Sequence, residues 1–529
     1  MSPCRVSHRN RALLTLSIAV CLVMTACSDS KTTPAAKEGI DRAQIDRAQV
    51  DTAIAKLRTR ITATLKDTGL PGLAMGVVFD DKVVATEGFG VRTLGQDGAV
   101  DADTVFQLAS VSKSLGGSVM ASLVGQKAFA WDDPVRTSDP GFALADPWVS
   151  DHVTFADLYS HRTGLPEHAG DLVEDLGYDR AAVLQRLRLY PLDPFRSSYH
   201  YTNFGMTEAG VAGAAKAGTT WEEASRKEIY GPLGMTNTSS TYADFISHAD
   251  HASGHVTKDG KWMVTPQQRQ PDAQSPAGGA SSSVNDMVKW VRMEIGGGMF
   301  DGRQVVDAEA LAETWLPHSL ANPPRTPTDR SGFYGLGLNV SYDDSGRLKL
   351  GHSGAFALGT GTAMTFFPAE KVGIIVLTNG EPSGIAEAMV ESFYDDLFRG
   401  HQTRDWVPFL KEIFKEIITP APEKDFAHPP ATAAPPAPEA TYVGTYTNEL
   451  FGPLEVATAP GGGLQIHIGP ARQTYPLHPY DGNEMWWQFA GENAGPPAAA
   501  TFNLAPDGRA SSLTLANLNK EGVGTFTRT

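Results

Sequence analysis

A serine and a lysine three residues apart stand at the expected start of an apolar helix. Ser110 and Lys113 open a segment in which apolar residues recur every fourth position from 111 to 123, a spacing typical of a buried helix. Residues three apart share a helix face, so the amine can reach the hydroxyl. A serine hydroxyl becomes nucleophilic when a base removes its proton, and burial can lower a lysine pKa from about 10.4 far enough for this task. Alone, this pair is a weak signal, and a serine that simply caps the helix is the alternative. Together with the two segments described next, it predicts nucleophilic catalysis by Ser110.

A phenol and an amide lie two residues apart in the polar, aromatic stretch SSYHYTNFGM. Tyr201 could carry the serine proton to a leaving group. Asn203 could hold either a substrate carbonyl or the Lys113 ammonium. The alternative for Tyr201 is an aromatic side chain that only packs in its loop.

The segment His352-Ser353-Gly354 follows a strand-like LKL run and precedes another strand. His352 is a candidate site residue, with a satisfied structural histidine as the alternative. The backbone at Gly354 and Ala355 could line the site as a sheet edge. Ser353 also invites comparison with the Gly-x-Ser-x-Gly turn of α/β-hydrolases. That turn needs a final glycine and a following helix, whereas Ala355 and the strand pattern GTGTAMTFF stand here, so Ser353 is rejected as the nucleophile.

Strand patterns on both sides of a long, mostly helical stretch predict the scaffold. The stretch from 110 to about 330 has many Gly, Pro and Asp breaks and is mostly helical in character. This order predicts an α/β (α+β) fold, in which an antiparallel sheet is built from both ends of the domain and flanked by helices. The expected elements are a helix through 54–65 that stops at Gly69 and Pro71, strands at 73–79 and 82–90 joined by Asp80-Asp81, strands at 347–354, 359–367 and 371–379, and a helix at 384–398.

The last quarter of the chain has a different pattern. Residues 419–440 contain seven prolines and seven alanines, which predicts an extended, semi-rigid linker after a main domain over 41–418. Residues 441–529 consist of short alternating segments such as LEVAT, LQIHI and SSLTL. They predict a small all-β barrel or sandwich, in which the Trp486-Trp487 pair is more often core than a ligand site.

The amino-terminal 26 residues have the pattern of an export signal. Three arginines precede an apolar run from Ala12 to Ala26, and small residues precede Cys27. This pattern is similar to a bacterial lipoprotein signal that is cleaved before Cys27 and lipidated there, with a plain secretory signal as the alternative. Residues 27–40 would then be a polar tether. We expect an exported protein in the periplasm or at the cell surface, anchored to a membrane by its lipid.

Composition excludes several classes of protein. The formal net charge of −16, from 60 acidic and 44 basic residues, argues against a nucleic-acid binder, which needs a basic face. The three cysteines lie at or before position 27, so the mature chain has no cysteine nucleophile and no thiolate metal site. The histidines lack metal-ligand spacing, and we expect no metal and no cofactor. His161 and Arg162 end a short helix that Thr154 and Asp157 would open as a capping box, and this segment is interpreted as structural.

Three motifs together carry a resemblance to a known family. Ser-Val-Ser-Lys at 110–113, Tyr-Thr-Asn at 201–203 and His-Ser-Gly at 352–354 resemble the motifs of the penicillin-recognising serine hydrolases, in the branch of class C β-lactamases, D-Ala-D-Ala carboxypeptidases, D-aminopeptidases and esterases. The likeness covers about residues 50–400 and implies a β-lactamase-like fold. Supporting stretches are LYSHRTGLP (158–166), SPAGGASSSVNDMVKWV (275–291), YGLGL (334–338) and VLTNG (376–380).

The resemblance implies a role for each site residue. Ser110 would be the nucleophile, Lys113 its partner base, and Tyr201 the general base and acid. Asn203, His352 and Gly354 would position the substrate, with His352 as an electrostatic or hydrogen-bonding group beside Tyr201, and the backbone N–H groups of Ser110 and Ala355 would form the oxyanion hole. His352 stands where typical β-lactamases carry a lysine, which moves the expectation from efficient β-lactam hydrolysis toward peptidase or esterase chemistry.

These observations predict an exported serine hydrolase that cleaves an ester or an amide through a Ser110 acyl-enzyme. The substrate would be a small molecule or a peptide, with D-amino-acid peptides and β-lactams among the candidate classes. The alternative function is a non-catalytic sensor or binding module of the penicillin-binding type on the same fold.

Overall fold

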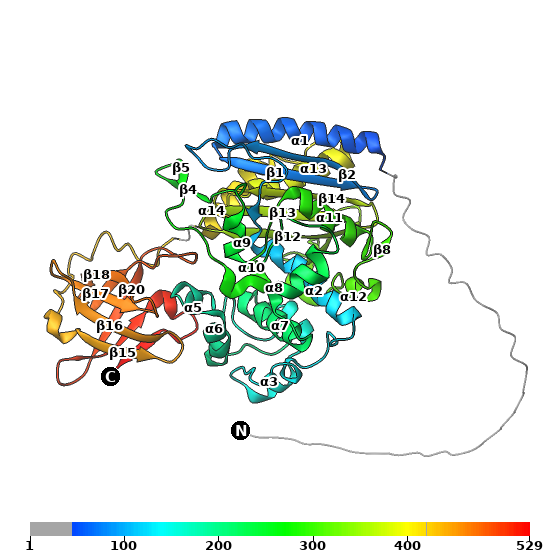
Figure 1. The fold of residues 1–529 in the computed structure, drawn as a ribbon. Helices are drawn as coiled ribbons and strands as arrows, with labels where there is room; N and C mark the ends of the chain where they lie inside the picture. Colours follow the sequence, from blue (N-terminus) through cyan, green and yellow to red (C-terminus); the bar gives the residue numbers. More distant parts are fainter. Residues whose placement is uncertain (1–44, 419–420) are drawn as a thin grey trace, which may run out of the picture. The chain divides into compact units, whose positions relative to one another are not determined.

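An eight-stranded antiparallel sheet forms the centre of the larger domain in the computed structural model (Figure 1). The strand order is β2-β1-β14-β13-β12-β11-β10-β9, so β1 from the beginning of the domain pairs with β14 from its end. The predicted sheet from both ends of the domain is therefore confirmed. Its strands are β1 Gly72–Phe79, β2 Lys82–Gly90, β9 Ser319–Asn322, β10 Gly332–Tyr334, β11 Asn339–Tyr342, β12 Leu348–Phe356, β13 Thr360–Phe367 and β14 Val372–Thr378.

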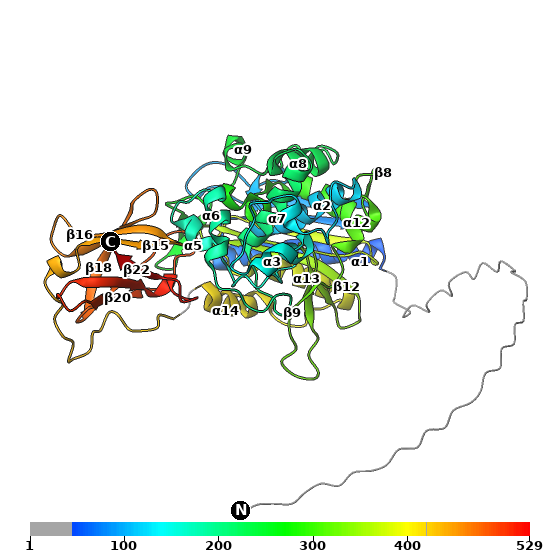
Figure 2. The same cartoon turned by 90° about the horizontal axis from the view of Figure 1, so that it is seen from below.

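Helices cover both faces of this sheet (Figures 1 and 2). On one face, α1 (Arg47–Thr68) and α13 (Ile385–Arg399) pack together over apolar side chains such as Met75 and Val376. On the other face, α11 (Val284–Ile295) packs against β1 and β14. Side chains alternate along a strand, so strands buried on both faces read as continuous apolar runs, as the fully buried β14 does.

Local signals in the sequence placed several element ends correctly. Helix α1 ends at Gly69, whose φ of 69° supplies the left-handed cap that glycine favours. The β1–β2 hairpin turns at Asp80 and Asp81, with φ of 46° and 58°. Two consecutive left-handed residues are typical of the tight turn that joins twisted strands.

A mostly helical insertion separates β2 from β9, as the sequence predicted. The 3-10 turn Ala109–Val111 leads directly into α2, so the helix expected at Ser110 begins with this turn. Two-stranded ribbons at 106–107 with 281–282, at 255–258 with 261–264 and at 299–300 with 303–304 complete the insertion. Besides α11, the helices of the insertion are α2 Ser112–Gly125, α3 Pro147–His152, α4 Phe155–Tyr159, α5 Asp171–Asp175, α6 Arg180–Arg186, α7 Asn203–Lys216, α8 Trp221–Ser225, α9 Tyr242–Ser247, α10 Ser275–Gly278 and α12 Ala308–Glu313.

A buried carboxylate holds two loops of the insertion side by side. Asp157 lies in α4, and its carboxylate accepts hydrogen bonds from Arg162 Nε at 2.7 Å and Arg196 Nη2 at 2.7 Å. Its side chain is fully buried, whereas the two arginines reach solvent. Next to these ion pairs, the backbone N–H of His200 donates to the carbonyl of His161 at 3.0 Å. The loop that ends in Tyr-Thr-Asn is therefore fastened to the end of α4.

The smaller domain is a closed barrel of eight antiparallel strands, which resolves the predicted barrel or sandwich. The pattern of short alternating segments did not include β18, because Pro476 and Pro479 inside this strand indicate a loop. Trp487 is a fully buried core residue, and Trp486 stacks on His478 with ring centroids 4.1 Å apart. The strands are β15 Gly444–Asn448, β16 Gly452–Thr458, β17 Leu464–Ile468, β18 Gln473–Asp481, β19 Glu484–Trp487, β20 Ala498–Leu504, β21 Ala510–Leu515 and β22 Thr525–Arg528.

The structure describes residues 45–418 and 421–529. Helix α14 (Trp406–Ile418) precedes the proline-rich stretch. The described part of this stretch contains no helix or strand before the short turn at Glu439–Thr441. It is attached to the barrel by a hydrogen bond from the backbone N–H of Ala434 to the carboxylate of Asp481, at 2.8 Å. The predicted signal segment, tether and Cys27 lie outside the described residues. Across the described ranges, none of the helices combines the length and apolar character that a bilayer crossing requires.

The Asp157 clamp generates a prediction about stability. Asp157→Asn should lower the free energy of unfolding by about 3 kcal/mol, because it removes the buried partner of two arginines. Asp151→Asn is a matched control, since Asp151 is 57% exposed and pairs with Arg136 at the surface, where ion pairs contribute about 0–1 kcal/mol. Urea denaturation measures both variants, and equal effects of the two substitutions would contradict the clamp.

Candidate active site

Ser110 lies in the 3-10 turn in front of α2, on a strained stretch of backbone. The preceding Ala109 has a φ of 47°, a left-handed conformation that costs energy for a residue with a Cβ atom. Neither this turn nor α2 has a side-chain cap hydrogen bond at its start, so the alternative in which Ser110 only caps a helix does not describe its hydroxyl. The hydroxyl instead contacts Lys113, at 3.1 Å between Oγ and Nζ, and hydrogen-bonds to Tyr201.

Three acceptors surround the buried amine of Lys113. Nζ donates to Ser110 Oγ at 3.1 Å, Asn203 Oδ1 at 2.7 Å and the carbonyl oxygen of Ala277 at 2.9 Å. Burial lowers the pKa of this ammonium to about 7, although the negative charge of Asp171 opposes the shift. In the neutral amine, the two carbonyl oxygens, which can only accept, take both N–H groups. The nitrogen lone pair then faces the Ser110 hydroxyl.

Tyr201 completes the cluster from the other side of the hydroxyl. The Lys113 Nζ atom lies 4.6 Å from the centre of the Tyr201 ring. Burial raises the pKa of the Tyr201 phenol well above its ordinary value, although the hydrogen bond with Ser110 acts in the opposite direction. The phenol is therefore protonated at neutral pH. It can donate its proton to another group only if it receives a proton from a neighbouring group at the same time.

The histidine interpreted as structural lies against Tyr201. The capping box of Thr154 and Asp157 is present at the start of α4, as predicted. His161, however, packs its ring 4.6 Å from that of Tyr201, and its Nδ1 accepts the backbone N–H of Thr202 at 3.2 Å. Burial is the main cause that lowers the pKa of His161 well below its ordinary value. The contacts of this neutral side chain are structural, as interpreted, but the sequence did not indicate that they lie beside Tyr201.

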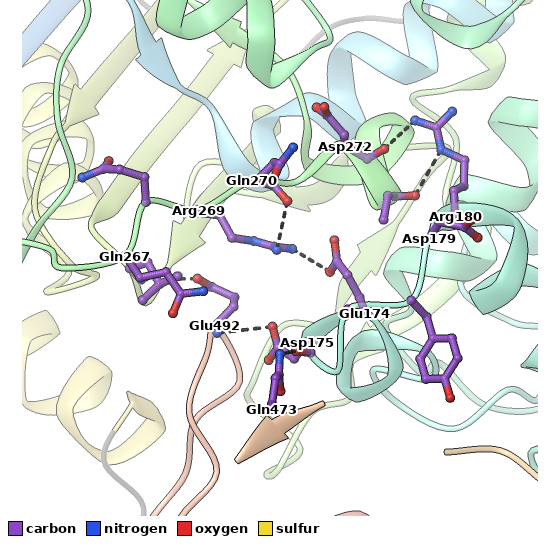
Figure 3. A pocket seen from close by; sticks show the side chains of 15 residues that line it. Glu174, Asp175, Asp179, Arg180, Gln267, Arg269, Gln270, Asp272, Gln473 and Glu492 are labelled. Atoms are coloured by element: carbon purple, nitrogen blue, oxygen red, sulfur yellow. Dashed lines mark hydrogen bonds and ion pairs between the residues drawn. The ribbon is translucent and has the colours of Figure 1, made fainter. Parts of the chain in front are cut away.

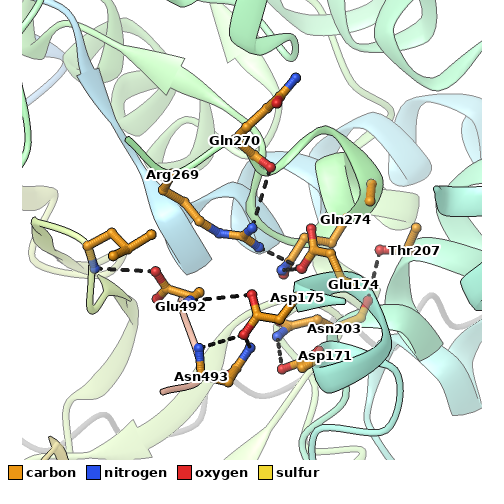
Figure 4. A network of polar contacts seen from close by, with 12 residues as sticks. Asp171, Glu174, Asp175, Asn203, Thr207, Arg269, Gln270, Gln274, Glu492 and Asn493 are labelled. Atoms are coloured by element: carbon orange, nitrogen blue, oxygen red, sulfur yellow. Dashed lines mark hydrogen bonds and ion pairs between the residues drawn. The ribbon is translucent and has the colours of Figure 1, made fainter. Parts of the chain in front are cut away.

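Asn203 begins α7 and is oriented by a carboxylate that the sequence analysis did not single out (Figure 4). Its Nδ2 donates to Asp171 Oδ2 at 2.8 Å, while its Oδ1 faces Lys113. Asp171 also contacts His168 Nδ1 at 2.9 Å. Both ends of the amide are thus engaged within the protein, so of the two roles left open for Asn203, the contact with Lys113 is the one present.

The edge of β12 lies directly beside the backbone of Ser110. Pairing of β11 with β12 ends at Gly351, so the remaining residues of β12 extend beyond β11. A methyl group on Gly354 would lie 2.3 Å from the carbonyl oxygen of Leu108 and 2.9 Å from the nitrogen of Ser110. Only a glycine permits this approach, which places the backbone of Ala355 next to the turn. Ser353 stands in a continuous strand and hydrogen-bonds to Glu387, in agreement with its rejection as a nucleophile.

His352 lies beside Tyr201, with 6.3 Å between the ring centres, but hydrogen-bonds elsewhere. Its Nδ1 contacts the carbonyl oxygen of Ser353 at 2.6 Å and must donate, because a carbonyl only accepts. Its Nε2 then accepts the hydroxyl proton of Tyr334 at 2.9 Å. Burial lowers the pKa of His352 to about 3, and the nearby Lys113 charge adds to this. His352 is a neutral hydrogen-bonding group here, and not a positive charge.

The structure therefore brings the predicted Ser110, Lys113, Tyr201 and Asn203 into one cluster and sets the β12 edge next to it. Their catalytic roles remain predictions. The additional residues are His161, Asp171, Ala277 and Tyr334. Three of these four residues lie in sequence stretches that carried the family resemblance, and that resemblance could have identified them. Asp171 lies outside those stretches, so nothing in the sequence indicated it.

The sequence matches two families of known domains. The Beta-lactamase family matches residues 57–391, which is more than half of the chain. A domain of unknown function, DUF3471, matches residues 428–524, which include the barrel from β15 to β21.

Individual relatives agree with the first match. Unguisins hydrolase ungD of Aspergillus violaceofuscus is 26% identical over 78% of this chain and 77% of its own length. Penicillin-binding protein 4 of Amycolatopsis lactamdurans is 28% identical over 65% of this chain and 88% of its own. The octameric penicillin-binding protein homologue from Pyrococcus abyssi has a TM-score of 0.56 at 21% identity, over 88% of this chain and 98% of that one, and shows the fold.

The close approach at Gly354 generates a prediction about reactivity. Gly354→Ala should slow labelling of Ser110 by a fluorophosphonate about a hundredfold, because a shift of about 1 Å at the reacting group has that effect. Gly461→Ala is the control, since a methyl group there meets nothing within 4 Å. Thermal denaturation of both variants shows whether they are equally folded at the temperature of labelling, and the labelling rates are compared under that condition. An unchanged rate in Gly354→Ala would remove the β12 edge from the site.

Proposed function

We propose, because this chain belongs to the β-lactamase family of penicillin-recognising serine hydrolases, that it hydrolyses an ester or an amide through an acyl-enzyme on Ser110. The observation that carries the proposal is the buried Lys113 amine, which lies 3.1 Å from the Ser110 hydroxyl and whose pKa is lowered to about 7. A base with a pKa close to neutral combines availability with proton affinity. The substrate is a small molecule or a peptide.

Acylation begins with a proton transfer to Lys113. Its neutral amine takes the proton of Ser110, and Oγ attacks the carbonyl carbon of the substrate. The former carbonyl oxygen becomes an oxyanion that the backbone N–H groups of Ser110 and Ala355 stabilise. The strained turn at Ala109 and the glycine at 354 are what bring these two backbone segments together.

The leaving group departs with a proton from Tyr201. The phenol donates its proton to the departing oxygen or nitrogen and recovers one from the Lys113 ammonium, so the amine is neutral again. Water then attacks the acyl-enzyme along the reverse path: it gives one proton to the amine, and Ser110 Oγ leaves with a proton. The product is a carboxylic acid.

The neutral state of His352 supports peptidase or esterase chemistry over efficient β-lactam hydrolysis. Its two ring nitrogens are engaged with Ser353 and Tyr334. It offers no positive charge to a substrate carboxylate at this sheet edge, unlike the lysine that typical β-lactamases carry here. Esters, amides and peptides that have no carboxylate next to the scissile bond do not need such a charge.

Export and lipid anchoring at Cys27 belong to the same proposal. They rest on the arginines, the apolar run and the small residues before Cys27. A Cys27→Ser chain expressed in a bacterial host should lose the incorporation of labelled fatty acid and leave the membrane fraction, whereas the wild-type chain retains both. Labelling of the variant at the wild-type level would contradict the anchor and leave the hydrolase unaffected.

The nucleophile is tested with two serine variants. Ser110→Ala should abolish covalent labelling by a fluorophosphonate and by a fluorescent penicillin, because it removes the hydroxyl that the Lys113 amine contacts. Ser353→Ala should label like the wild type, since Ser353 contacts Glu387 and not Lys113. Labelling of Ser110→Ala at the wild-type rate would overturn the proposal. A wild-type chain that labels but turns over no ester or peptide would be the sensor module instead.

The pH dependence of the reaction follows from Lys113. Its amine must be neutral to accept the serine proton, and its pKa is lowered to about 7. The value of kcat/KM for an ester should therefore rise as the pH increases through about 7 and fall roughly tenfold for each unit below it. Esters with leaving groups of different pKa should give the same profile. A rise near pH 10 would mean that the buried amine keeps the ordinary lysine pKa.

A further inference from the structure

Two backbone N–H groups in the turn between β12 and β13 bind a side chain of the barrel (Figure 4). Ala357 and Leu358 lie between the paired ends of these strands, outside the ladder of the sheet. The Glu492 carboxyl accepts the N–H of Ala357 at 2.6 Å and that of Leu358 at 3.3 Å. Backbone donors that are withdrawn from water need partners of this kind. Glu492 therefore completes the hydrogen bonding of the turn.

The barrel loop that carries Glu492 is itself anchored on α5 (Figures 3 and 4). The carboxylate of Asp175, the last residue of α5, accepts the backbone N–H and the Nδ2 of Asn493, at 2.7 and 2.9 Å. It also accepts the N–H of Glu492 at 3.3 Å. A methyl group on Gly491 would lie 3.2 Å from both oxygens of this carboxylate, so the loop backbone lies directly on α5. One barrel loop therefore binds both the insertion and the turn after β12.

A polar cavity of about 600 Å³ lies beside this loop, between the barrel and the insertion (Figure 3). Asp175, Leu358 and Glu492 are among the residues that line it. At this place the barrel contacts the larger domain through hydrogen bonds and not through apolar packing. The length of one side chain, that of Glu492, therefore determines where the turn is held.

The turn directly follows the part of β12 that faces Ser110. Ala355 lies two residues before Ala357, and a methyl group on Gly354 would lie 2.9 Å from the backbone nitrogen of Ser110. Beyond Gly351, β12 has no pairing with β11 and is paired only with β13. The position of Ala355 relative to Ser110 therefore depends on β13 and on the turn that joins the two strands.

The contact between Glu492 and the turn does not require a negative charge. Burial raises the pKa of Glu492 to about 8, although the nearby positive charge of Arg269 opposes the shift. The carboxyl is therefore mostly protonated at neutral pH. A protonated carboxyl keeps a carbonyl oxygen that accepts a hydrogen bond as an amide oxygen does. A glutamine at this position would thus preserve the contact with the N–H of Ala357.

We propose that Glu492 of the barrel is a positioning residue of the active site, which holds the β12–β13 turn so that the N–H of Ala355 stays aimed at the oxyanion. The anchor on Asp175 fixes the loop of Glu492 in turn, so the barrel keeps the sheet edge at a constant distance from the insertion. The barrel then acts in acyl transfer through backbone geometry and without touching the substrate. The inference rests on the proposed function, to which the oxyanion hole belongs.

The experiment compares p-nitrophenyl acetate with its thionoacetate, in which sulfur replaces the carbonyl oxygen. Sulfur accepts hydrogen bonds only weakly, so the thionoester gains little from the N–H groups of an oxyanion hole. The ratio of kcat/KM for the ester to kcat/KM for the thionoester therefore reports how well these N–H groups are aligned. A smaller fraction of folded protein lowers both values equally and leaves the ratio unchanged, so the ratio separates positioning from stability.

Four variants test the geometry of the contact. Glu492→Ala should lower the ester-to-thionoester ratio at least about tenfold, because one oxyanion donor contributes about a hundredfold or more. Glu492→Gln should restore the wild-type ratio, since it keeps the length of the side chain and an acceptor oxygen. Glu492→Asp should behave like Glu492→Ala, because its carboxyl is one methylene too short to reach the turn. Glu455→Ala is the matched control and should leave the ratio unchanged, since Glu455 pairs with Arg472 within the barrel.

Amide hydrogen exchange tests the turn itself and does not depend on turnover. The N–H groups of Ala357 and Leu358 should exchange at least about tenfold faster in Glu492→Ala than in the wild type, because they lose their acceptor. Unchanged exchange would overturn the contact. An unchanged ester-to-thionoester ratio in folded Glu492→Ala would overturn the positioning role, as would a ratio that Glu492→Gln fails to restore. If Glu492→Ala does not fold, Glu492→Asp supplies the same two measurements.

The positioning role and the hydrolase fail in different ways. Hydrolysis of p-nitrophenyl acetate by the wild type, but not by Ser110→Ala, supports the serine hydrolase whatever the Glu492 variants show. If the wild type hydrolyses no ester and Ser110 cannot be labelled, both proposals are overturned, even where hydrogen exchange shows that Glu492 holds the turn.

Discussion

The burial of one amine sets the conditions for the rest of this structure. Lys113 is completely buried, and a buried ammonium without partners is strongly disfavoured. Its partners come from separate parts of the chain: Ser110 from the preceding turn, Asn203 from α7 and Ala277 from α10. The same burial that demands these partners also brings the pKa of the amine close to neutrality. Stability and reactivity therefore have a common origin in this fold.

The sheet and the helical insertion each supply one side of the cleft. The sheet supplies the exposed edge of β12, and the turn at Ala109 supplies the facing backbone; a glycine at 354 lets the two approach. On the insertion side, the ion pairs of Asp157 fasten the loop of Tyr201 to the end of α4. Rigid scaffolding of this kind matters because small displacements at a reacting group cost large factors in rate.

The barrel is connected to the site through backbone groups and not through a large apolar contact alone. Glu492 accepts two N–H groups of the turn after β12, and Asn493 holds the carboxylate at the end of α5. The same helix begins with Asp171, which orients Asn203. The barrel loop and the amide that faces Lys113 therefore contact opposite ends of one short helix.

Much of this architecture follows from the sequence, because it depends on local spacing. The three-residue interval of Ser110 and Lys113, the turn at Asp80-Asp81 and the period of the strands are properties of neighbouring residues. Neighbouring residues also identified Tyr201 and Asn203, through motifs whose order along the chain is distinctive. Strand β18 was missed for the same reason, since its two prolines indicate a loop when no barrel is known to surround them.

The tertiary structure alone decided which distant groups meet. Asp171 and Glu492 carry no local signal, and each forms a hydrogen bond with a residue far away in the sequence, at separations of 32 and 135 positions. His161 lies just after the end of α4, close to where the sequence suggests, yet only the folded chain places it against Tyr201. Protonation belongs to the same class, because the lowered pKa values of Lys113 and His352 come from burial among groups of remote segments, and spacing along a chain does not determine burial.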